Sequence, residues 1–340
     1  MIVPGHHADA VARATQTLQA GGLLGLPTET VYGLAADATN ARAVQAIFST
    51  KGRPSDHPLI VHVVNVQAAN RFAQHIPEFA QRLMQAFWPG PLTLILPRRP
   101  EQAAVAAGGQ DTVGLRCPSH PVAQAVLAAC AEQGIWGLAA PSANRFGRVS
   151  PTTAQHVQAE LGPDLLILDG GPCSVGIESC IVDCTRGAPV LLRPGTLTPQ
   201  ALQLACGCKV LSAADLHAVD QPSPRASGTL ESHYAPSAQV RLMAASALQD
   251  AVALMDAELR LTRRSQARLA VYSRCPVQTS SAAIIQRHMP DNADDAAQEL
   301  FAALRDLDEL GVGLIWVETP PSTPEWDGVR DRLMRAAAHR

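Results

Sequence analysis

The chain has 340 residues, of which 47% are hydrophobic, 17% are charged and only 4% are aromatic. This apolar content excludes disorder as the main state, and the length predicts about two domains. The net charge is −3, so a surface that binds polyanions in general is not expected, while a local basic pocket is compatible with it.

Helix and strand patterns alternate through the first 205 residues. Apolar residues recur at helical spacing over 8–20, and the short apolar run 23–26 before Pro27 predicts a buried strand. Similar patterns predict helices at 41–50, 77–87, 151–161 and 198–205, and strands at 59–64, 92–96, 112–116, 136–140, 165–168, 180–184 and 189–193. Because strands outnumber helices, we expect a mixed α/β sheet and not a strict βαβ repeat.

A proline-, serine- and glycine-rich segment, residues 211–237, follows and shows no sustained period. Beyond it, regular alternation returns, as is typical of an open α/β sheet. The elements expected there are strands at 239–243, 268–273 and 313–317 and helices at 246–260, 293–310 and 326–338. We therefore predict two domains, 1–210 and 238–340, joined by a linker over 211–237.

The eight cysteines include no C-x-x-C pair, which favours a reduced protein over a disulfide framework. Cys173, Cys180 and Cys184 lie close together in the sequence, but no second Cys or His pair has zinc-like spacing, so we expect no metal site built from them. The N-terminus shows no signal peptide, and no run of about 18 apolar residues occurs. We predict a cytoplasmic protein without a membrane segment.

Neither common nucleotide-binding fingerprint is present, and the G-x-S-x-G sequence of nucleophile-elbow hydrolases is also missing. Polar and cationic clusters stand instead at the ends of predicted strands. They occupy residues 27–33, 51–54, 112–116, 140–144, 170–180 and 193–195. Each cluster has a simpler structural explanation as a turn, a cap or a salt bridge, but together they indicate one pocket.

The chemistry of three clusters can be stated more closely. Lys51-Gly52-Arg53-Pro54 suits a phosphate or carboxylate, although a basic helix C-terminus is an equal alternative. Thr112, Gly114 and Arg116 share one strand face, which favours a ligand lying against the sheet. Ser142 has no evident activating base and is interpreted as a binding residue.

Six motifs follow one another in an order that is specific in combination: P-T-E-T-V-Y-G-L, K-G-R-P with P-L-I-V-H, T-V-G-L-R, A-P-S-A-N with S-P-T, E-S-x-I and L-R-P-G. Through residues 10–205 the chain thereby resembles the YrdC-like family. The linker sequence S-G-T-L-E-S-H-Y-A-P and the ending D-R-L-M-R-A-A resemble the long, two-domain form of that family, the threonylcarbamoyl-AMP synthases of tRNA modification.

The resemblance implies an enzyme that joins L-threonine, bicarbonate and ATP into L-threonylcarbamoyl-AMP and pyrophosphate, with Mg²⁺ accompanying the nucleotide. A downstream tRNA threonylcarbamoyl transferase complex then modifies an adenosine next to the anticodon. The implied fold is a twisted mixed sheet with a large concave cavity, a smaller Rossmann-like C-terminal domain, and a linker that closes over the cavity as a lid.

Site residues follow from the resemblance position by position. The L-threonine contacts are Thr30, His62, Arg116, the backbone at Ala140 and Ser179, and the ATP contacts are Arg53, His57, Thr112, Ser142, Ser150, Arg193 and Tyr234. Lys51 and Arg53 are expected to neutralise charge developing at the α-phosphorus. His57 and Cys180 stand where the family commonly has asparagine and threonine. No general base is evident, and His62 is a weak candidate.

Two alternatives of other classes remain at this point. An RNA-binding or ribosome-associated module needs clustered positive charge, whereas residues 1–210 carry 14 basic and 13 acidic side chains. A carbamoyltransferase of the hydrogenase-maturation type would need zinc-binding C-x-x-C pairs and an acylphosphatase-like segment, and the sequence has neither. We expect no stable nucleic-acid binding and no membrane association.

Overall fold

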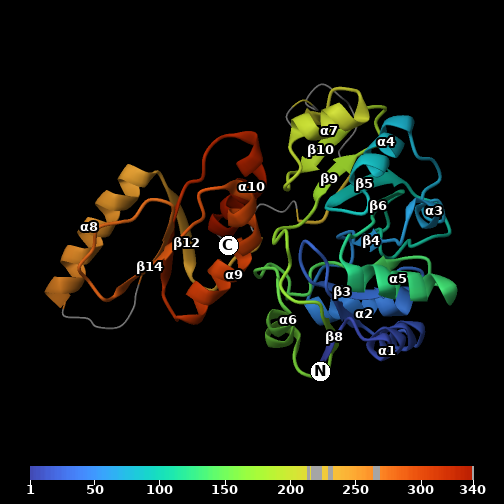
Figure 1. Cartoon of the computed structure of the whole chain (residues 1–340), viewed down its shortest axis with the longest axis horizontal. Helices are drawn as coiled ribbons and strands as arrows, with labels where there is room; N and C mark the ends of the chain where they lie inside the picture. The colour runs from blue at the N-terminus through green and yellow to red at the C-terminus, as the bar shows by residue number, and fades with distance from the viewer. Residues whose placement is uncertain (213–214, 216–223, 229–232, 263–268, 339–340) are drawn as a thin grey trace. The chain divides into compact units, whose positions relative to one another are not determined.

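The computed structural model describes residues 1–212, 215, 224–228, 233–262 and 269–338. The chain divides into two compact units, one of residues 1–146 with 150–229 and the other of residues 147–149 with 230–340. Each unit has a sheet of its own with helices packed against it (Figure 1).

The first unit is built on an 11-stranded sheet that contains both parallel and antiparallel pairs, in the order β1-β8-β2-β3-β7-β4-β6-β5-β9-β10-β11. This confirms the predicted mixed α/β sheet. The strands are β1 (Ile2–Pro4), β2 (Leu24–Leu26), β3 (Gly33–Asp37), β4 (Ile60–His62), β5 (Leu92–Pro97), β6 (Thr112–Arg116), β7 (Leu138–Ala139), β8 (Leu166–Asp169), β9 (Cys180–Asp183), β10 (Val190–Arg193) and β11 (Leu211–Ser212).

Seven helices of the described chain belong to this unit. They are α1 (Ala8–Gln19), α2 (Ala41–Lys51), α3 (Val66–Ala69), α4 (Glu78–Phe87), α5 (Pro121–Glu132), α6 (Ala154–Leu161) and α7 (Pro199–Cys206). Asn40 caps α2 by accepting hydrogen bonds from the N–H groups of Arg42 and Ala43. The helix ends at Gly52, whose φ of +64° is a left-handed conformation that favours glycine, and Arg53 follows.

The register of the central strands separates a packed face from an open one. Leu115 and Val61 are aligned in β6 and β4, and both are buried in the hydrophobic core, to which α2, α4 and α7 also contribute. The alternate residues, His62 and Arg116, are aligned on the opposite face, and Thr93 of β5 lies directly across from Arg116. Hydrophobic burial on one face therefore presents polar side chains on the other.

The second unit has a four-stranded, all-parallel sheet in the order β12-β15-β13-β14, which confirms the predicted Rossmann-like architecture. Its strands are β12 (Gln239–Met243), β13 (Leu269–Ser273), β14 (Ile284–His288) and β15 (Leu314–Glu318). Its helices are α8 (Ala245–Thr262), α9 (Ala293–Glu309), α10 (Asp327–Ala337) and a short 3₁₀ helix, Pro324–Trp326.

Several elements were missing from the sequence-based prediction. Helix α5 was missed because its sequence, PVAQAVLAACAE, is apolar around most of its circumference and shows no helical period. Strand β3 consists of Gly33, Leu34, two alanines and Asp37, and is held by antiparallel pairing with β2 and β7. Strands β1 and β14 and the four-residue helix α3 were also not predicted.

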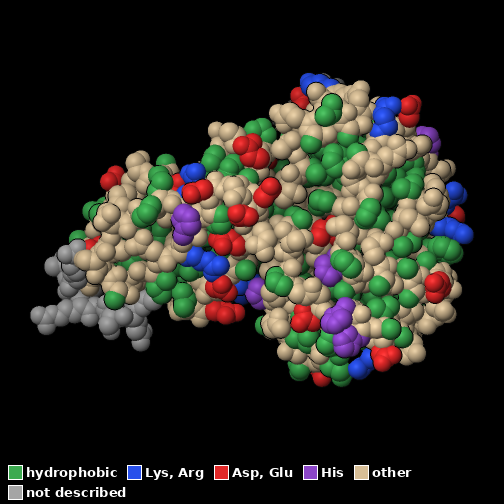
Figure 2. All heavy atoms as spheres, in the orientation of Figure 1, with side chains coloured by type: hydrophobic (Ala, Val, Ile, Leu, Met, Phe, Trp, Pro, Cys, Tyr) green, Lys and Arg blue, Asp and Glu red, His purple; other side chains and the backbone are tan. Residues whose placement is uncertain are grey.

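The surface seen in Figure 2 carries Lys and Arg side chains scattered among Asp and Glu side chains, without a continuous basic patch on that face. Among the residues that the structure describes, no helix is long and apolar enough to cross a membrane.

Candidate active site

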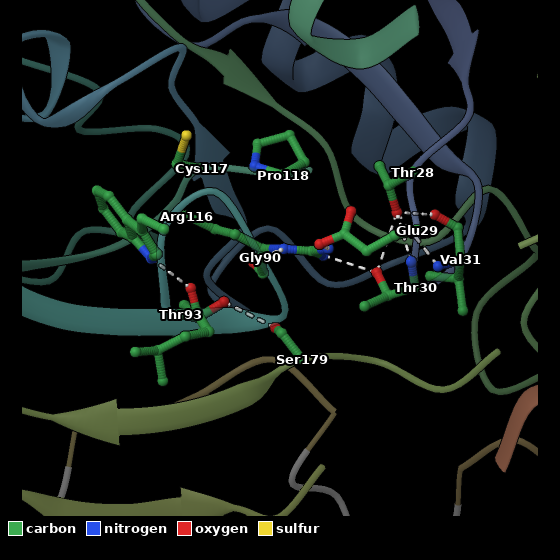
Figure 3. Close-up of polar contacts among 12 residues, drawn as sticks. Thr28, Glu29, Thr30, Val31, Gly90, Thr93, Arg116, Cys117, Pro118 and Ser179 are labelled. Carbon is green, nitrogen blue, oxygen red and sulfur yellow. Dashed lines mark hydrogen bonds and ion pairs between the residues drawn. The ribbon is translucent and has the colours of Figure 1, made fainter. Parts of the chain in front are cut away.

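Arg116, at the end of β6, is the centre of one polar cluster (Figure 3). Its Nη1 donates to Thr30 Oγ1 at 2.7 Å, and its Nε donates to the Gly90 carbonyl at 3.3 Å. Its Nη2 lies 2.6 Å from Glu29 Oε1. The guanidinium is 4% exposed, so this cation sits inside the protein with a carboxylate as its counter-ion.

The turn that carries Thr30 is held by a hydroxyl (Figure 3). Thr28 Oγ1 accepts hydrogen bonds from the N–H groups of Thr30 and Val31 at 3.2 Å and donates to the Val31 carbonyl at 2.6 Å. It also lies 3.0 Å from Thr30 Oγ1. This is the local structure that serine and threonine favour in turns, and it fixes the Thr30 hydroxyl beside Arg116.

His62 faces the same side of the sheet as Arg116, as the alternation along its strand predicted. Its side chain is buried, and its Nδ1 has no hydrogen-bond partner. Burial, with a smaller contribution from the Arg116 charge, lowers the pKa of His62 to about 3. The imidazole is therefore neutral at neutral pH, which suits a hydrogen-bonding contact and makes it a weak base.

Ser179 links this cluster to a second cation. Its Oγ lies 2.8 Å from Thr93 Oγ1, and its carbonyl accepts from Nε and Nη2 of Arg193 at 3.1 and 2.9 Å. Arg193 ends β10, and Nη1 of its buried guanidinium donates to the Ser227 carbonyl at 2.8 Å. Four separate stretches of sequence thus meet at one edge of the open face.

Arg53 reaches the same residue of the linker. Its Nη2 donates to the Pro58 carbonyl at 3.0 Å and to Ser227 Oγ at 3.4 Å. Two buried arginines, Arg53 and Arg193, therefore both contact Ser227. A small, half-open cavity lies over the open face, with a lining that comprises Pro58, Leu59, Ile60, Thr93, Ile95, Gln110, Thr112, Gly114, Ile181, Arg225, Ala226 and Ser227.

Lys51, at the end of α2, is buried and directed at a neighbouring loop. Its Nζ donates to the Ser142 carbonyl at 2.5 Å and to the Asn144 carbonyl. Burial holds the pKa of the Lys51 ammonium well below its ordinary value, and the Arg53 charge lowers it further. The lysine thus fixes the loop that carries Ser142, the segment predicted to contact the nucleotide.

The remaining predicted residues lie in several places. Ser150 donates to Glu178 Oε1 at 2.5 Å, and the His57 ring packs against Phe146 with a centroid distance of 5.5 Å. The N–H of Ala140 donates to the Ile60 carbonyl, which joins its loop to β4.

Tyr234 belongs to the second unit. It is buried there with its ring 5.4 Å from that of Phe301 and with Arg332 over the ring. Its predicted contact with the nucleotide stays a prediction.

Sequence reasoning assigned no role to Glu29, Thr93 or Ser227, which the structure brings into the cluster. A lone threonine in the apolar run of β5 was a usable signal, because its side chain had to face away from the core. Glu29 stood inside a cluster already singled out, but its pairing with a residue 87 positions away cannot be read from the sequence.

Chemically, the site offers buried guanidinium groups, an ammonium group and several hydroxyls, all suited to anions. Among the described residues, no group of three or more His, Cys, Asp or Glu side chains is arranged to hold a metal ion. The open sheet face, with a pocket whose Ser227 is contacted by two buried arginines, together with a separate parallel α/β unit, defines a two-domain protein of the YrdC-like class.

Comparison with known proteins identifies the family. A family model described as "Telomere recombination", covering the Sua5, YciO and YrdC proteins, matches residues 16–195, and one described as "Threonylcarbamoyl-AMP synthase, C-terminal domain" matches residues 198–338. The chain belongs to the threonylcarbamoyl-AMP synthase family of enzymes, which confirms the resemblance seen in its motifs.

Individual relatives are similar over nearly their whole length. Threonylcarbamoyl-AMP synthases of Pyrococcus abyssi and Bacillus subtilis are each 36% identical to this chain, covering 95% and 97% of it and 92% and 93% of their own lengths. The crystal structure of P. abyssi Sua5 complexed with L-threonine is similar with a TM-score of 0.86 and 32% identity, covering 99% of this chain and 97% of that one.

Proposed function

We propose that the protein makes L-threonylcarbamoyl-AMP and pyrophosphate from L-threonine, bicarbonate and ATP, and that the product serves threonylcarbamoyl modification of a tRNA adenosine. The observation that carries the proposal is the convergence of Arg116 with Thr30 and of Arg53 with Arg193 on one face of the sheet. A relative's complex with L-threonine supports the amino-acid substrate.

Threonine is expected at the Arg116 end of this face. A guanidinium can hold a carboxylate with two parallel hydrogen bonds, and Arg116 is presented by a strand of the sheet, which fixes its direction. The hydroxyls of Thr30 and Ser179 and the neutral imidazole of His62 surround it as further hydrogen-bonding groups.

ATP is expected at the Arg53 and Arg193 end, where two buried guanidinium groups contact the same residue, Ser227, and are suited to hold an anionic ligand. Mg²⁺ usually reaches a protein through the phosphates of the nucleotide and one or two carboxylates, and it keeps several waters. That mode of binding needs no cage of protein ligands; the carboxylate of Glu178 accepts a hydrogen bond from Ser150, one of the predicted nucleotide contacts.

The reaction then needs no protein nucleophile. The neutral amine of threonine attacks bicarbonate to give a carbamate and water, and a carbamate oxygen attacks the α-phosphorus of ATP while pyrophosphate leaves. Cations at the phosphates stabilise the charge that develops in the second step. With a pKa of about 3, His62 is not suited to carry the amine proton, so the weak nomination of this residue as general base is not pursued.

The test is pyrophosphate release by the purified full chain with ATP, Mg²⁺, L-threonine and bicarbonate, and with each component omitted in turn. We expect release only when all are present, together with a threonine-containing adenylate detected by mass spectrometry. Release without threonine would contradict the proposal. Binding of tRNA that weakens steeply with salt, without adenylate synthesis, would instead support the RNA-binding alternative.

A further inference from the structure

Glu29 is a buried carboxylate whose oxygens lack hydrogen bonds. Its side chain is 6% exposed, and neither Oε1 nor Oε2 has a hydrogen-bond partner, although Oε1 lies 2.6 Å from Arg116 Nη2. Its backbone carbonyl is used, since it accepts from the N–H of Val175 at 2.7 Å. A buried carboxylate with one guanidinium nitrogen as its sole partner among the described residues is under-satisfied and costly, and in a binding site a ligand can supply the missing donors.

The surroundings leave Arg116 as the counter-charge of Glu29. The other titratable groups that face Glu29 are Cys117 after β6, His120 before α5 and Cys173 in the glycine-rich loop. Burial raises the pKa of both thiols and lowers that of His120, so all three are neutral at neutral pH. Glu29 and Arg116 therefore form an isolated pair of opposite charges.

We propose that this ion pair opens to receive the amino acid, so that Arg116 takes the α-carboxylate and Glu29 takes the α-ammonium group. This inference rests on the proposed function, because it names the group that recognises the amine of the threonine substrate. An amino acid is a zwitterion, and it replaces each partner of the internal pair with a charge of the same sign. Each buried charge has a partner of opposite sign both before and after the exchange, which limits the cost of breaking such a pair.

The location fits this exchange. Thr93 lies directly across from Arg116 in the sheet and lines the cavity, so the ion pair, although not itself in that lining, neighbours a residue that is. Arg116 Nη1 and Nε stay anchored by Thr30 and Gly90, so only the Nη2 contact with Glu29 has to be exchanged. Figure 3 shows the Glu29 carboxylate at the tip of the guanidinium, beside Thr30.

The proposal predicts selectivity for the amine that can be measured by binding alone. By calorimetry, the wild-type chain should bind L-threonine about tenfold or more tightly than 2,3-dihydroxybutanoate of matching configuration, which has a hydroxyl in place of the amine. In Glu29→Gln this preference should fall by about tenfold or more. The deaminated compound should bind the variant at least as well as it binds the wild type, because Glu29 no longer competes for Arg116.

If Glu29 had only a structural role, Glu29→Gln would weaken the binding of both compounds by a similar factor. The ratio of the two affinities therefore distinguishes a structural role from recognition of the amine. Glu29→Asp, which keeps the charge, should restore part of the preference. Asp183→Asn is the matched control, because Asp183 is an equally buried acid paired with Arg186 at 2.8 Å, and it should leave the ratio within about twofold.

Equal wild-type affinities for the two compounds, or an unchanged ratio in Glu29→Gln, would overturn the inference while leaving the proposed function intact. A wild-type chain that binds neither compound would instead contradict the proposed function, and with it the inference. The wild-type comparison requires no variant, so the proposal is tested even if Glu29→Gln does not fold.

Discussion

Lys51 shows how a single buried amino group can fix a loop. Its ammonium donates to the carbonyls of Ser142 and Asn144, and it is one of only two lysines in a chain with 27 basic residues. Burial and the Arg53 charge lower its pKa, so its charged form is disfavoured until a counter-charge arrives. Phosphates bound nearby would favour the charged form again, which couples nucleotide binding to the loop that carries Ser142.

Lys51→Arg should lower adenylate formation by about tenfold or more, even though it keeps a positive charge. A planar guanidinium does not fit the space that a compact ammonium occupies 2.5 Å from a carbonyl, and it remains charged whether or not a counter-charge is present. The measurement is pyrophosphate release at saturating threonine, bicarbonate and Mg²⁺-ATP.

Lys209→Arg is the matched control, since Lys209 is the only other lysine and its side chain is exposed. We expect its activity to remain within about twofold of the wild type. Near wild-type activity of Lys51→Arg would show that the geometry of the ammonium group does not matter for the reaction.

At the scale of elements, a described piece of the predicted linker is seated on the first unit. Arg225 Nη1 lies 2.6 Å from Asp56 Oδ2, and the backbone of Arg225 exchanges hydrogen bonds with the Gln110 side chain. Ser227 contacts Arg53 and Arg193. Within the predicted lid, 211–237, residues 213–214, 216–223 and 229–232 lie outside the described residues.

These contacts favour a segment that closes over the cavity and can leave it. Both members of the Arg225–Asp56 pair are more than half exposed, and exposed ion pairs contribute at most about 1 kcal/mol. By contrast, the two contacts at Ser227 come from arginines that we expect to hold the nucleotide. We therefore expect ligands to strengthen the closed arrangement of residues 224–228.

Limited proteolysis with trypsin tests this expectation. Cleavage after Arg225 should slow by about fivefold or more when ATP and L-threonine are both present, because the segment is then held against the first unit. Arg225→Gln removes this cleavage site and identifies the corresponding fragment. Equal cleavage with and without the two ligands would contradict a lid role.

Helices and strands could be predicted from the sequence where the spacing of their apolar residues matches the face that they bury in the fold. Strand β6 was predicted with its observed ends, and the shared face of Thr112, Gly114 and Arg116 follows from the two-residue period alone. Helix α5 and strand β3 were not, because one lacks an amphipathic period and the other depends on its two neighbouring strands. Hydrophobic periodicity alone therefore does not reveal either element, although Pro121 at the first turn and the alanines of α5 are local signals of a helix.

For the whole molecule, a net charge close to zero is compatible with an anion-binding site in which several cationic side chains are gathered. Lys51, Arg53, Arg116 and Arg193 are all buried and directed inward, so they add little to the surface. The sequence could predict that its motifs form one pocket, because their positions at strand ends constrain them. It could not predict the counter-ions, such as Glu29, since those depend on which strand ends meet.

The most direct measurement is a crystal structure of the full chain with L-threonine and a non-hydrolysable ATP analogue. The account predicts that the threonine carboxylate contacts Arg116 and that the triphosphate contacts Arg53 and Arg193, with both ligands in one continuous cavity. Threonine bound away from Arg116, or a triphosphate that reaches neither Arg53 nor Arg193, would contradict it.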